Sequence, residues 1–298
     1  MKKFLLLLIT LITFPFTVQA KLNVVASIPE LAALAQAIGG ERITVSSIAK
    51  ANQDPHFLDA RPSFVVSLSR ADLLIHVGLG LEVGWLPPLL TQSRNGKIQP
   101  GNPGNLDAST GISLLEIGAA QDRSGGDIHP MGNPHYWLDP RNSFIIAQNI
   151  SQSLSLLDAE GKSYYQERLS TFQTQLKSKL QTWSSQIEKM RGKKIVSYHR
   201  SLNYFTAWTG LNVVAYIEPK PGIPPSSKHV TYLQQLIGQE KVTAIFAESF
   251  YPHKVPEFLS QKTKVPLIIF SNSNDTQGAE AYFALFEKLL KEMNEAIK

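Results

Sequence analysis

The sequence predicts an α/β protein of two lobes, in which parallel sheets are covered by helices and one long helix links the lobes. Strand-like and helix-like segments alternate in both halves of the chain, and such alternation is typical of parallel sheets with helices on both faces. Between the halves, Lys162–Arg191 is a polar, glycine-poor stretch in which apolar residues recur at helical spacing. The alternation of strands and helices starts again after Gly192.

Residues 1–20 are expected to be a signal peptide. Lys2 and Lys3 precede a mostly apolar stretch from Phe4 to Phe16, and Val18-Gln19-Ala20 offers small residues for cleavage. This apolar stretch is too short to span a bilayer as a stable helix. The sequence contains no cysteine, so it offers no disulfide and no thiol for a lipid anchor after the leader. We therefore expect a periplasmic protein without stable membrane insertion.

The charge balance argues against a nucleic-acid partner. The chain carries 29 basic and 24 acidic residues, for a formal net charge of +5, and it has no basic run. Nucleic-acid-binding domains usually gather their basic residues into a patch or stripe.

The first lobe is expected to span residues 21–160. Pro29 suits the first turn of its first helix, and Gly39-Gly40 suits the end of that helix. The expected strands are 22–28, 43–48 and 71–77, and the expected helices are 29–38, 62–69, 81–90 and 142–157.

Two parts of this lobe are less regular. Pro87-Pro88 is expected to interrupt the helix over 81–90. Residues 91–134 are rich in Gly, Asn, Ser and Asp, which predicts a loop. The apolar island Ile112–Ile117 predicts one short strand within that loop.

Residues 161–191 are expected to form the linking helix. About 30 residues at 1.5 Å per residue give a helix of roughly 45 Å, which is longer than one small lobe needs. A coiled-coil arm is the alternative, but we expect a rigid strut between two lobes. The apolar residues along one side of this helix are Tyr165, Leu169, Phe172, Leu176, Leu180 and Trp183.

The second lobe is expected to span residues 192–298. A proline-rich loop, Glu218–Pro225, follows its second strand. The expected strands are 194–198, 211–217, 242–248 and 265–270, and the expected helices are 202–209, 227–238, 255–263 and a terminal helix from about 278.

Two similar phrases place histidines on stiff loops. One is Asp54-Pro55-His56, and the other is Asn133-Pro134-His135. The proline before each histidine fixes its own φ and biases its neighbour toward extended conformations. A third histidine, His199, directly follows a predicted strand. We expect His56, His135 and His199 to converge on one transition metal ion.

Other polar residues follow strands of the second lobe, where ligands of open parallel sheets bind. Glu248 ends one strand, and Asn272 lies just after another. A water, Glu248 or Asn272 could fill a fourth metal position. Glu248, Asp54 and Asp139 are alternatively acceptors that would orient the histidine rings.

The four remaining histidines are weaker candidates. His76 lies inside an apolar strand and is expected in the core. His229 and His253 are expected to be structural or solvent-exposed. The role of His129 and of the loop over 118–133 stays open.

Three imidazoles without a thiolate point first to Zn²⁺. Imidazole suits zinc, copper, iron or nickel, whereas an oxygen-rich site suits magnesium, calcium or manganese. Zinc binds neutral imidazole nitrogens in tetrahedral geometry.

The motifs resemble those of a known family, the periplasmic metal-binding proteins of zinc and manganese ABC importers (cluster A-I solute-binding proteins). The resemblance covers essentially the whole chain after the leader. It implies two α/β lobes joined by a long helix, with metal bound between them by His56, His135 and His199. The segments that carry it are Asp54–His56, Arg61–Ser63, Ser69–Leu73, Asn133–Pro140 and Ser197–His199.

Two features depart from the family pattern. Asn272 stands where many members have a carboxylate ligand, which weakens the case for manganese. Zinc importers commonly carry a long histidine-rich loop before the second ligand, whereas the corresponding loop here has only His129.

The sequence therefore predicts a monomeric, non-enzymatic binding protein that delivers a divalent transition metal, first of all Zn²⁺, to the membrane permease of an ABC importer. A zinc-dependent hydrolase is an alternative, but the sequence has no His-Glu-x-x-His motif. A manganese-binding, iron-binding or organic-solute-binding protein of the same transport class is a further alternative.

Overall fold

The computed structural model describes residues 20–118, 129–271, 273 and 278–297. The expected signal peptide, apart from Ala20, lies outside the described residues, and so does Asn272.

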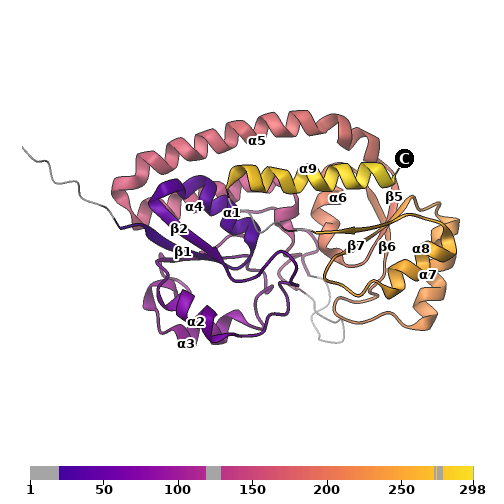
Figure 1. Cartoon of the computed structure of the whole chain (residues 1–298), viewed down its shortest axis with the longest axis horizontal. Coiled ribbons are helices and arrows are strands. Elements are labelled where there is room, and N and C mark those ends of the chain that lie inside the picture. The colour runs from indigo at the N-terminus through magenta and orange to yellow at the C-terminus, as the bar shows by residue number, and fades with distance from the viewer. Residues whose placement is uncertain (1–19, 119–128, 272, 274–277, 298) are drawn as a thin grey trace, which may run out of the picture.

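The chain folds into two lobes, each built on a four-stranded parallel sheet (Figure 1). The strand orders are β2-β1-β3-β4 and β6-β5-β7-β8, so the two sheets share one topology, and every pairing is parallel. The predicted α/β class is confirmed. The strands are β1 (Leu22–Ala26), β2 (Ile43–Ser47), β3 (Leu73–His76), β4 (Asn105–Asp107), β5 (Lys194–Ser197), β6 (Asn212–Tyr216), β7 (Ala244–Glu248) and β8 (Leu267–Phe270).

The helices cover the sheets and connect consecutive strands. The α-helices are α1 (Pro29–Gly39), α2 (Pro62–Ser69), α3 (Leu86–Ser93), α4 (Ser143–Leu157), α5 (Lys162–Met190), α6 (Asn203–Thr209), α7 (Ser227–Gln239), α8 (Lys254–Thr263) and α9 (Ala279–Ala296). Two short 3₁₀ helices near the predicted histidines are η4 (Tyr136–Leu138) and η7 (Arg200–Leu202).

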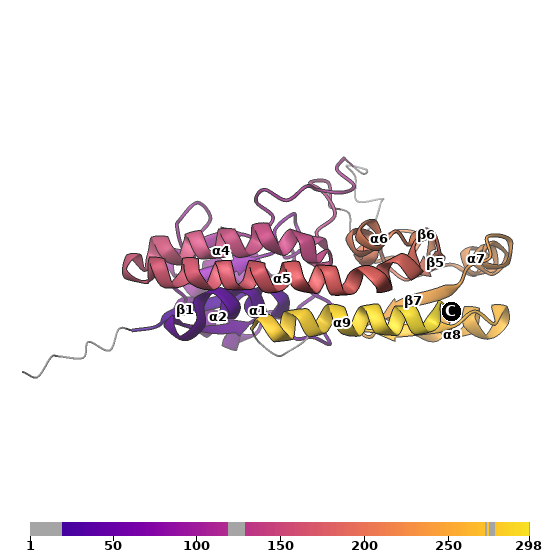
Figure 2. The ribbon, with the colours of Figure 1, turned by 90° about the horizontal axis from the view of Figure 1, so that it is seen from above.

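The long helix α5 runs along both lobes, as predicted (Figures 1 and 2). Tyr165 near its start and Trp183 near its end are both buried. The C-terminal helix α9 lies beside α5 and also packs against α1 and β8. Two helices therefore bridge the lobes, where the sequence predicted one.

Two local predictions were wrong. Pro87 and Pro88 do not interrupt a helix; they lie in the first turn of α3, where a backbone N–H has no helical partner to lose. The island Ile112–Ile117 forms no strand, and the fourth strand of the first sheet is the polar segment Asn105–Asp107, which pairs with β3.

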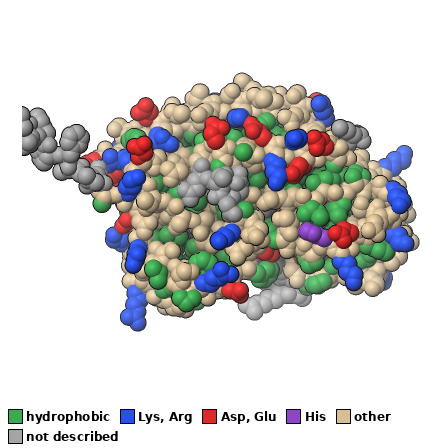
Figure 3. Space-filling view, in the orientation of Figure 1, with side chains coloured by type: hydrophobic (Ala, Val, Ile, Leu, Met, Phe, Trp, Pro, Cys, Tyr) green, Lys and Arg blue, Asp and Glu red, His purple; other side chains and the backbone are tan. Residues whose placement is uncertain are grey.

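One face of the molecule is mixed in charge. On the face shown in Figure 3, Lys and Arg side chains are interspersed with Asp and Glu. Among the helices that the structure describes, none combines the length and the apolar character needed to cross a bilayer.

Candidate metal centre

The structure brings His56, His135 and His199 together between the two sheets. Each offers a ring nitrogen that lies within 4.8 Å of the nitrogens of the other two. The ring centroids are 5.1 to 5.3 Å apart, and the three residues are 6%, 2% and 4% exposed. Within the described residues, this is the single group of histidines and carboxylates with the spacing of a metal site.

The two histidines of the first lobe are held by the same local turn. The backbone N–H of His56 donates to Asp54 Oδ1 at 3.0 Å, and its Nδ1 lies 2.7 Å from the same oxygen. The backbone N–H of His135 donates to Asn133 Oδ1 at 2.9 Å, and its Nδ1 lies 2.9 Å from that oxygen. The Asp or Asn two residues before each histidine thus fixes both the turn and the ring.

His199 comes from the second lobe, directly after Tyr198 at the end of β5. Its Nδ1 lies 2.9 Å from Glu218 Oε2. Glu218 is itself 8% exposed, and its backbone N–H donates to the Tyr198 carbonyl at 3.0 Å. Sequence reasoning missed Glu218 as the partner of His199, although it stands where β6 ends beside β5.

These acceptors determine which nitrogen of each ring can bind a metal. An imidazole that donates from Nδ1 carries its lone pair on Nε2. Asp54, Asn133 and Glu218 therefore favour the tautomer in which Nε2 is the metal-binding atom, which is the usual arrangement around protein-bound metals.

Burial favours the neutral form of His135 and His199. It lowers the pKa of His135 well below its usual value, and the neighbouring histidines lower it further. Burial also lowers the pKa of His199, although the hydrogen bond to Glu218 works in the opposite direction. Burial by itself would raise the pKa of Asp54, but its hydrogen bonds with His56 bring that pKa below the usual value. The site thus combines two imidazoles whose neutral form is favoured with one carboxylate, Asp54, whose ionised form is favoured.

Side chains from buried positions fix the backbone around the histidines. Trp85 Nε1 donates to the Pro55 carbonyl at 2.9 Å. The Tyr136 hydroxyl donates to the Val77 carbonyl at 2.7 Å. A metal ion would therefore meet loops that are already ordered, which reduces the entropy lost on binding.

Glu248 and Asp139, the described candidates, do not join the histidine group. Glu248 is fully buried and its carboxylate contacts the Ser201 hydroxyl; burial raises its pKa to about 8. Asp139 pairs with Arg141 at 2.6 Å rather than with a histidine. Asn272 lies outside the described residues, so the structure does not place it relative to the histidines.

His129 lies close to the group without joining it. Its ring centroid is 5.3 Å from that of His56, and its Nδ1 lies 3.2 Å from the Leu79 carbonyl oxygen. His229 Nε2 faces the Tyr216 carbonyl at 3.0 Å.

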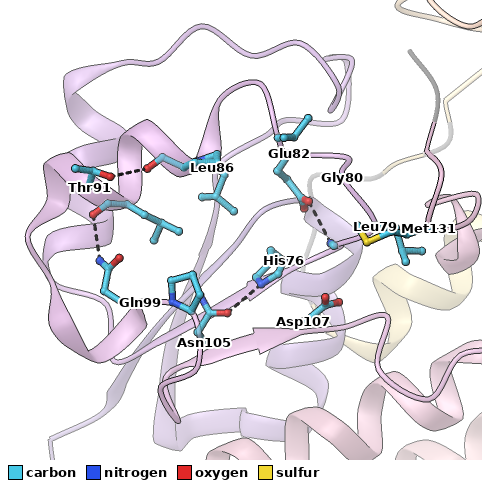
Figure 4. Close-up of a pocket in the computed structure, with 15 residues that line it drawn as sticks. His76, Leu79, Gly80, Glu82, Leu86, Thr91, Gln99, Asn105, Asp107 and Met131 are labelled. Atoms are coloured by element: carbon cyan, nitrogen blue, oxygen red, sulfur yellow. Dashed lines mark hydrogen bonds between the residues drawn. The ribbon is translucent and has the colours of Figure 1, made fainter. Parts of the chain in front are cut away.

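His76 is half-buried rather than packed in the core. Its Nε2 lies 3.0 Å from Asn105 Oδ1, and it lines a cavity of about 590 Å³ in the first lobe (Figure 4). Asp107 and Leu86 line the same cavity, whereas none of the three grouped histidines does.

Comparison with known proteins gives a family match over nearly the whole chain. The family model for ZnuA, described as zinc-uptake complex component A, periplasmic, matches residues 24–296. The manganese ABC transporter substrate-binding lipoprotein PsaA of Streptococcus pneumoniae is 26% identical over 286 residues, which cover 93% of this chain and 89% of the relative. The iron ABC transporter substrate-binding lipoprotein MtsA of Streptococcus pyogenes is also 26% identical, with the same coverage.

Solved structures share the fold. A crystal structure of ZnuA matches with a TM-score of 0.79 at 22% identity, covering 93% of this chain and 100% of the other. A deletion mutant of ZnuA with zinc bound matches with a TM-score of 0.78 at 22% identity, covering 93% and 98%. The match across residues 24–296 assigns the chain to the ZnuA family, whose members are metal-binding solute-binding proteins of ABC importers and not enzymes.

Proposed function

We propose that this protein captures Zn²⁺ in the periplasm and delivers it to the permease of an ABC importer. His56, His135 and His199 are the proposed ligands, each through Nε2. The leader-like segment at 1–20 and the periplasmic description of the family support this location. The protein is proposed to act as a monomer.

The convergence of three buried histidines from two lobes is the observation that carries the proposal. Burying a histidine is unfavourable unless its polar atoms are satisfied. A shared cation would satisfy the ring nitrogens of all three histidines at once. Neutral imidazole nitrogens without a thiolate favour zinc over harder, oxygen-seeking ions. The fourth position is proposed to be filled by water or by Asn272.

Manganese is the second candidate cargo. The streptococcal relative PsaA is named as a manganese transporter component, and MtsA is named for iron. Both are only 26% identical to this chain, so small changes around the metal could change the preferred ion. Competition titration of the metal-free protein with zinc, manganese and iron(II) would rank the three.

The test is metal analysis of the purified protein. We expect one zinc per chain by mass spectrometry after loading and desalting, and we expect His56→Ala and His199→Ala to lose it. His229→Ala is the matched control, because His229 bonds to a backbone carbonyl outside the group. Zinc retained by both ligand variants would refute the assignment.

A further inference from the structure

A second polar cluster joins the segments that carry His135 and His199. It consists of Glu116 and Asn133 from the first lobe, and of Arg200 and Asn203 from the second, and we refer to it as the Glu116 cluster. Glu116 belongs to the long loop after β4, and Arg200 and Asn203 belong to η7 and α6.

Both oxygens of the Glu116 carboxylate accept hydrogen bonds. Oε1 accepts from Arg200 Nη1 at 2.8 Å and from Asn203 Nδ2 at 2.9 Å. Oε2 accepts from Asn133 Nδ2 at 2.9 Å. Glu116 and Arg200 are only partly exposed, with 29% and 42% of their side-chain surface in contact with solvent.

The orientation of the Asn133 amide is set by its other partners. Its Oδ1 accepts from the backbone N–H of His135 at 2.9 Å, and its Nδ2 donates to the Arg200 carbonyl at 3.0 Å. A backbone N–H can only donate and a carbonyl can only accept. The atom that faces Glu116 must therefore be the amide nitrogen, so this neighbour of the carboxylate is a donor.

The three partners of Glu116 in the cluster are close in sequence to a proposed ligand. Asn133 lies two residues before His135 and bonds to its Nδ1. Arg200 directly follows His199, and its guanidinium packs over the ring of Tyr216 at 4.6 Å. Glu116 thus links the loop that positions one ligand to the turn that follows another ligand in the opposite lobe.

The backbone at Glu116, which makes these contacts, adopts an unusual conformation. Its φ of +58° lies in the left-handed region, which is unfavourable for a residue with a side chain. The neighbouring Leu115 anchors it, because the Leu115 N–H donates to the Tyr204 hydroxyl at 2.9 Å and the Asn133 N–H donates to the Leu115 carbonyl at 2.8 Å. Such strain persists where surrounding contacts require it.

We propose that Glu116 is a positioning residue that sets how long the protein retains its metal. By joining the two ligand segments, it resists the separation of His135 from His199 that release of the ion requires. This inference rests on the proposed function, because it assumes that the ion binds at the three histidines.

The substitution Glu116→Gln gives a sharp test, because it changes few atoms. A glutamine side chain has one accepting end and one donating end. Whichever way it turns, its NH₂ group faces either Asn133 Nδ2 or the donors of Arg200 and Asn203. The variant should therefore lose at least one hydrogen bond to a charged or buried partner and weaken the link between the lobes.

The experiment measures zinc dissociation by mixing the zinc-loaded protein with an excess of a chromogenic chelator in a stopped-flow instrument. We expect Glu116→Gln and Arg200→Met each to release zinc about tenfold faster or more, with the zinc stoichiometry and the association rate changed little. The double variant should release zinc more slowly than the product of the two single effects, because both substitutions break one shared contact. Glu240→Gln is the control, since it loses an exposed ion pair with Lys194 at the opposite end of β5 from His199.

The outcomes separate this inference from the proposed function. If the wild-type protein binds no zinc, the proposed function fails. If it binds zinc and Glu116→Gln releases the ion at the wild-type rate, the inference about Glu116 fails and the proposed function stands. Thermal unfolding of the metal-free variants identifies a folding defect, and a correctly folded variant with unchanged release overturns the inference.

Discussion

Two carboxylates stand directly behind the proposed ligands. Asp54 accepts from the ring of His56, and Glu218 accepts from the ring of His199. A divalent ion on three neutral imidazoles would carry its full charge into a buried site, which is costly without compensation. We expect Asp54 and Glu218 to supply that compensation, because each accepts from a histidine ring that would hold the ion.

Glu218 allows the contribution of charge to be separated from that of orientation. Glu218→Ala removes both, and we expect zinc affinity to fall about 10- to 100-fold. Glu218→Gln keeps an acceptor for His199 but removes the charge, and it should lie between the wild type and Glu218→Ala. Competition against a chelator of known affinity measures the effect, and Glu257→Ala, on an exposed turn of α8, is the control. Wild-type affinity in Glu218→Ala would mean that the carboxylate does not assist binding.

The lowered pKa of His135 predicts a pH effect on the metal-free protein. An unfolded chain protonates histidine as the pH falls below about 6.5, whereas the buried ring of His135 stays neutral to lower pH. The unfolded state then binds more protons, so stability declines as the pH falls below about 6.5. Burial raises the pKa of Glu248 to about 8, so the contribution of Glu248 to stability increases as the pH falls. The experiment must therefore compare two proteins that both retain Glu248.

The comparison uses His135→Gln. Melting temperatures of the metal-free wild type and of the variant, measured at pH 7.5 and 5.5, should show a smaller loss on acidification in the variant. Both proteins retain Glu248, so its contribution cancels in the difference. Equal losses would show that His135 is protonated as readily in the folded state as in the unfolded chain.

The sequence was informative about ligands and uninformative about some of their partners. The repeated Asp/Asn-Pro-His phrase contains its own acceptor, because a side chain two residues before a histidine can reach that residue's backbone N–H. The pairing of Glu218 with His199 needs β5 and β6 to lie side by side. That pairing is a tertiary fact, and residues 19 positions apart in sequence give no local signal for it.

The two bridging helices share an aromatic core. Phe286 of α9 is fully buried, and its ring centroid lies 5.8 Å from that of Trp183 in α5 and 5.9 Å from that of Trp208 in α6. The C-terminal helix therefore completes the packing of the second lobe while it also reaches α1 in the first. The position of α9 could not be predicted from its hydrophobic pattern. That pattern shows that the helix has one apolar face, but it does not show which elements cover that face.

Truncation of this core should be costly. Phe286→Ala removes a ring with no solvent contact, and we expect the free energy of unfolding to fall by about 3–5 kcal/mol. Glu287→Ala on the exposed side removes only a surface ion pair with Lys179 and should cost less than about 1 kcal/mol. Urea unfolding of the metal-free proteins measures both. Equal, small effects would mean that α9 contributes little to stability.

Element boundaries were predicted well where local rules decide them. Pro29 and Pro62 each begin a helix at the expected position. The errors arose where tertiary pairing decides. Asn105–Asp107 is polar and short but finds a partner in β3, whereas the apolar island Ile112–Ile117 packs as an irregular loop. Hydrophobic pattern alone cannot separate these outcomes.

The molecule as a whole consists of two lobes of like topology, with the candidate metal site where they meet. α5 and α9 span both lobes on one side (Figure 2). The Glu116 cluster joins the two lobes beside the histidines. Because two helices bridge the lobes, we expect metal release to involve only a small change in the distance between His199 and the other two histidines.

This arrangement predicts that the cargo stabilises the whole chain. A ligand that binds only the folded state adds RT ln(1 + [L]/Kd), or about 2.7 kcal/mol when free ligand is a hundredfold above Kd. We expect zinc to raise the melting temperature by several degrees and to shift both lobes together, because its ligands come from both. A chelator should reverse the shift. His199→Ala should lose most of it while His229→Ala keeps it, since only the former lies in the histidine group. A full zinc-induced rise in melting temperature in His199→Ala would mean that zinc stabilises the protein from another site. The proposed role of the metal in joining the two lobes would then be wrong.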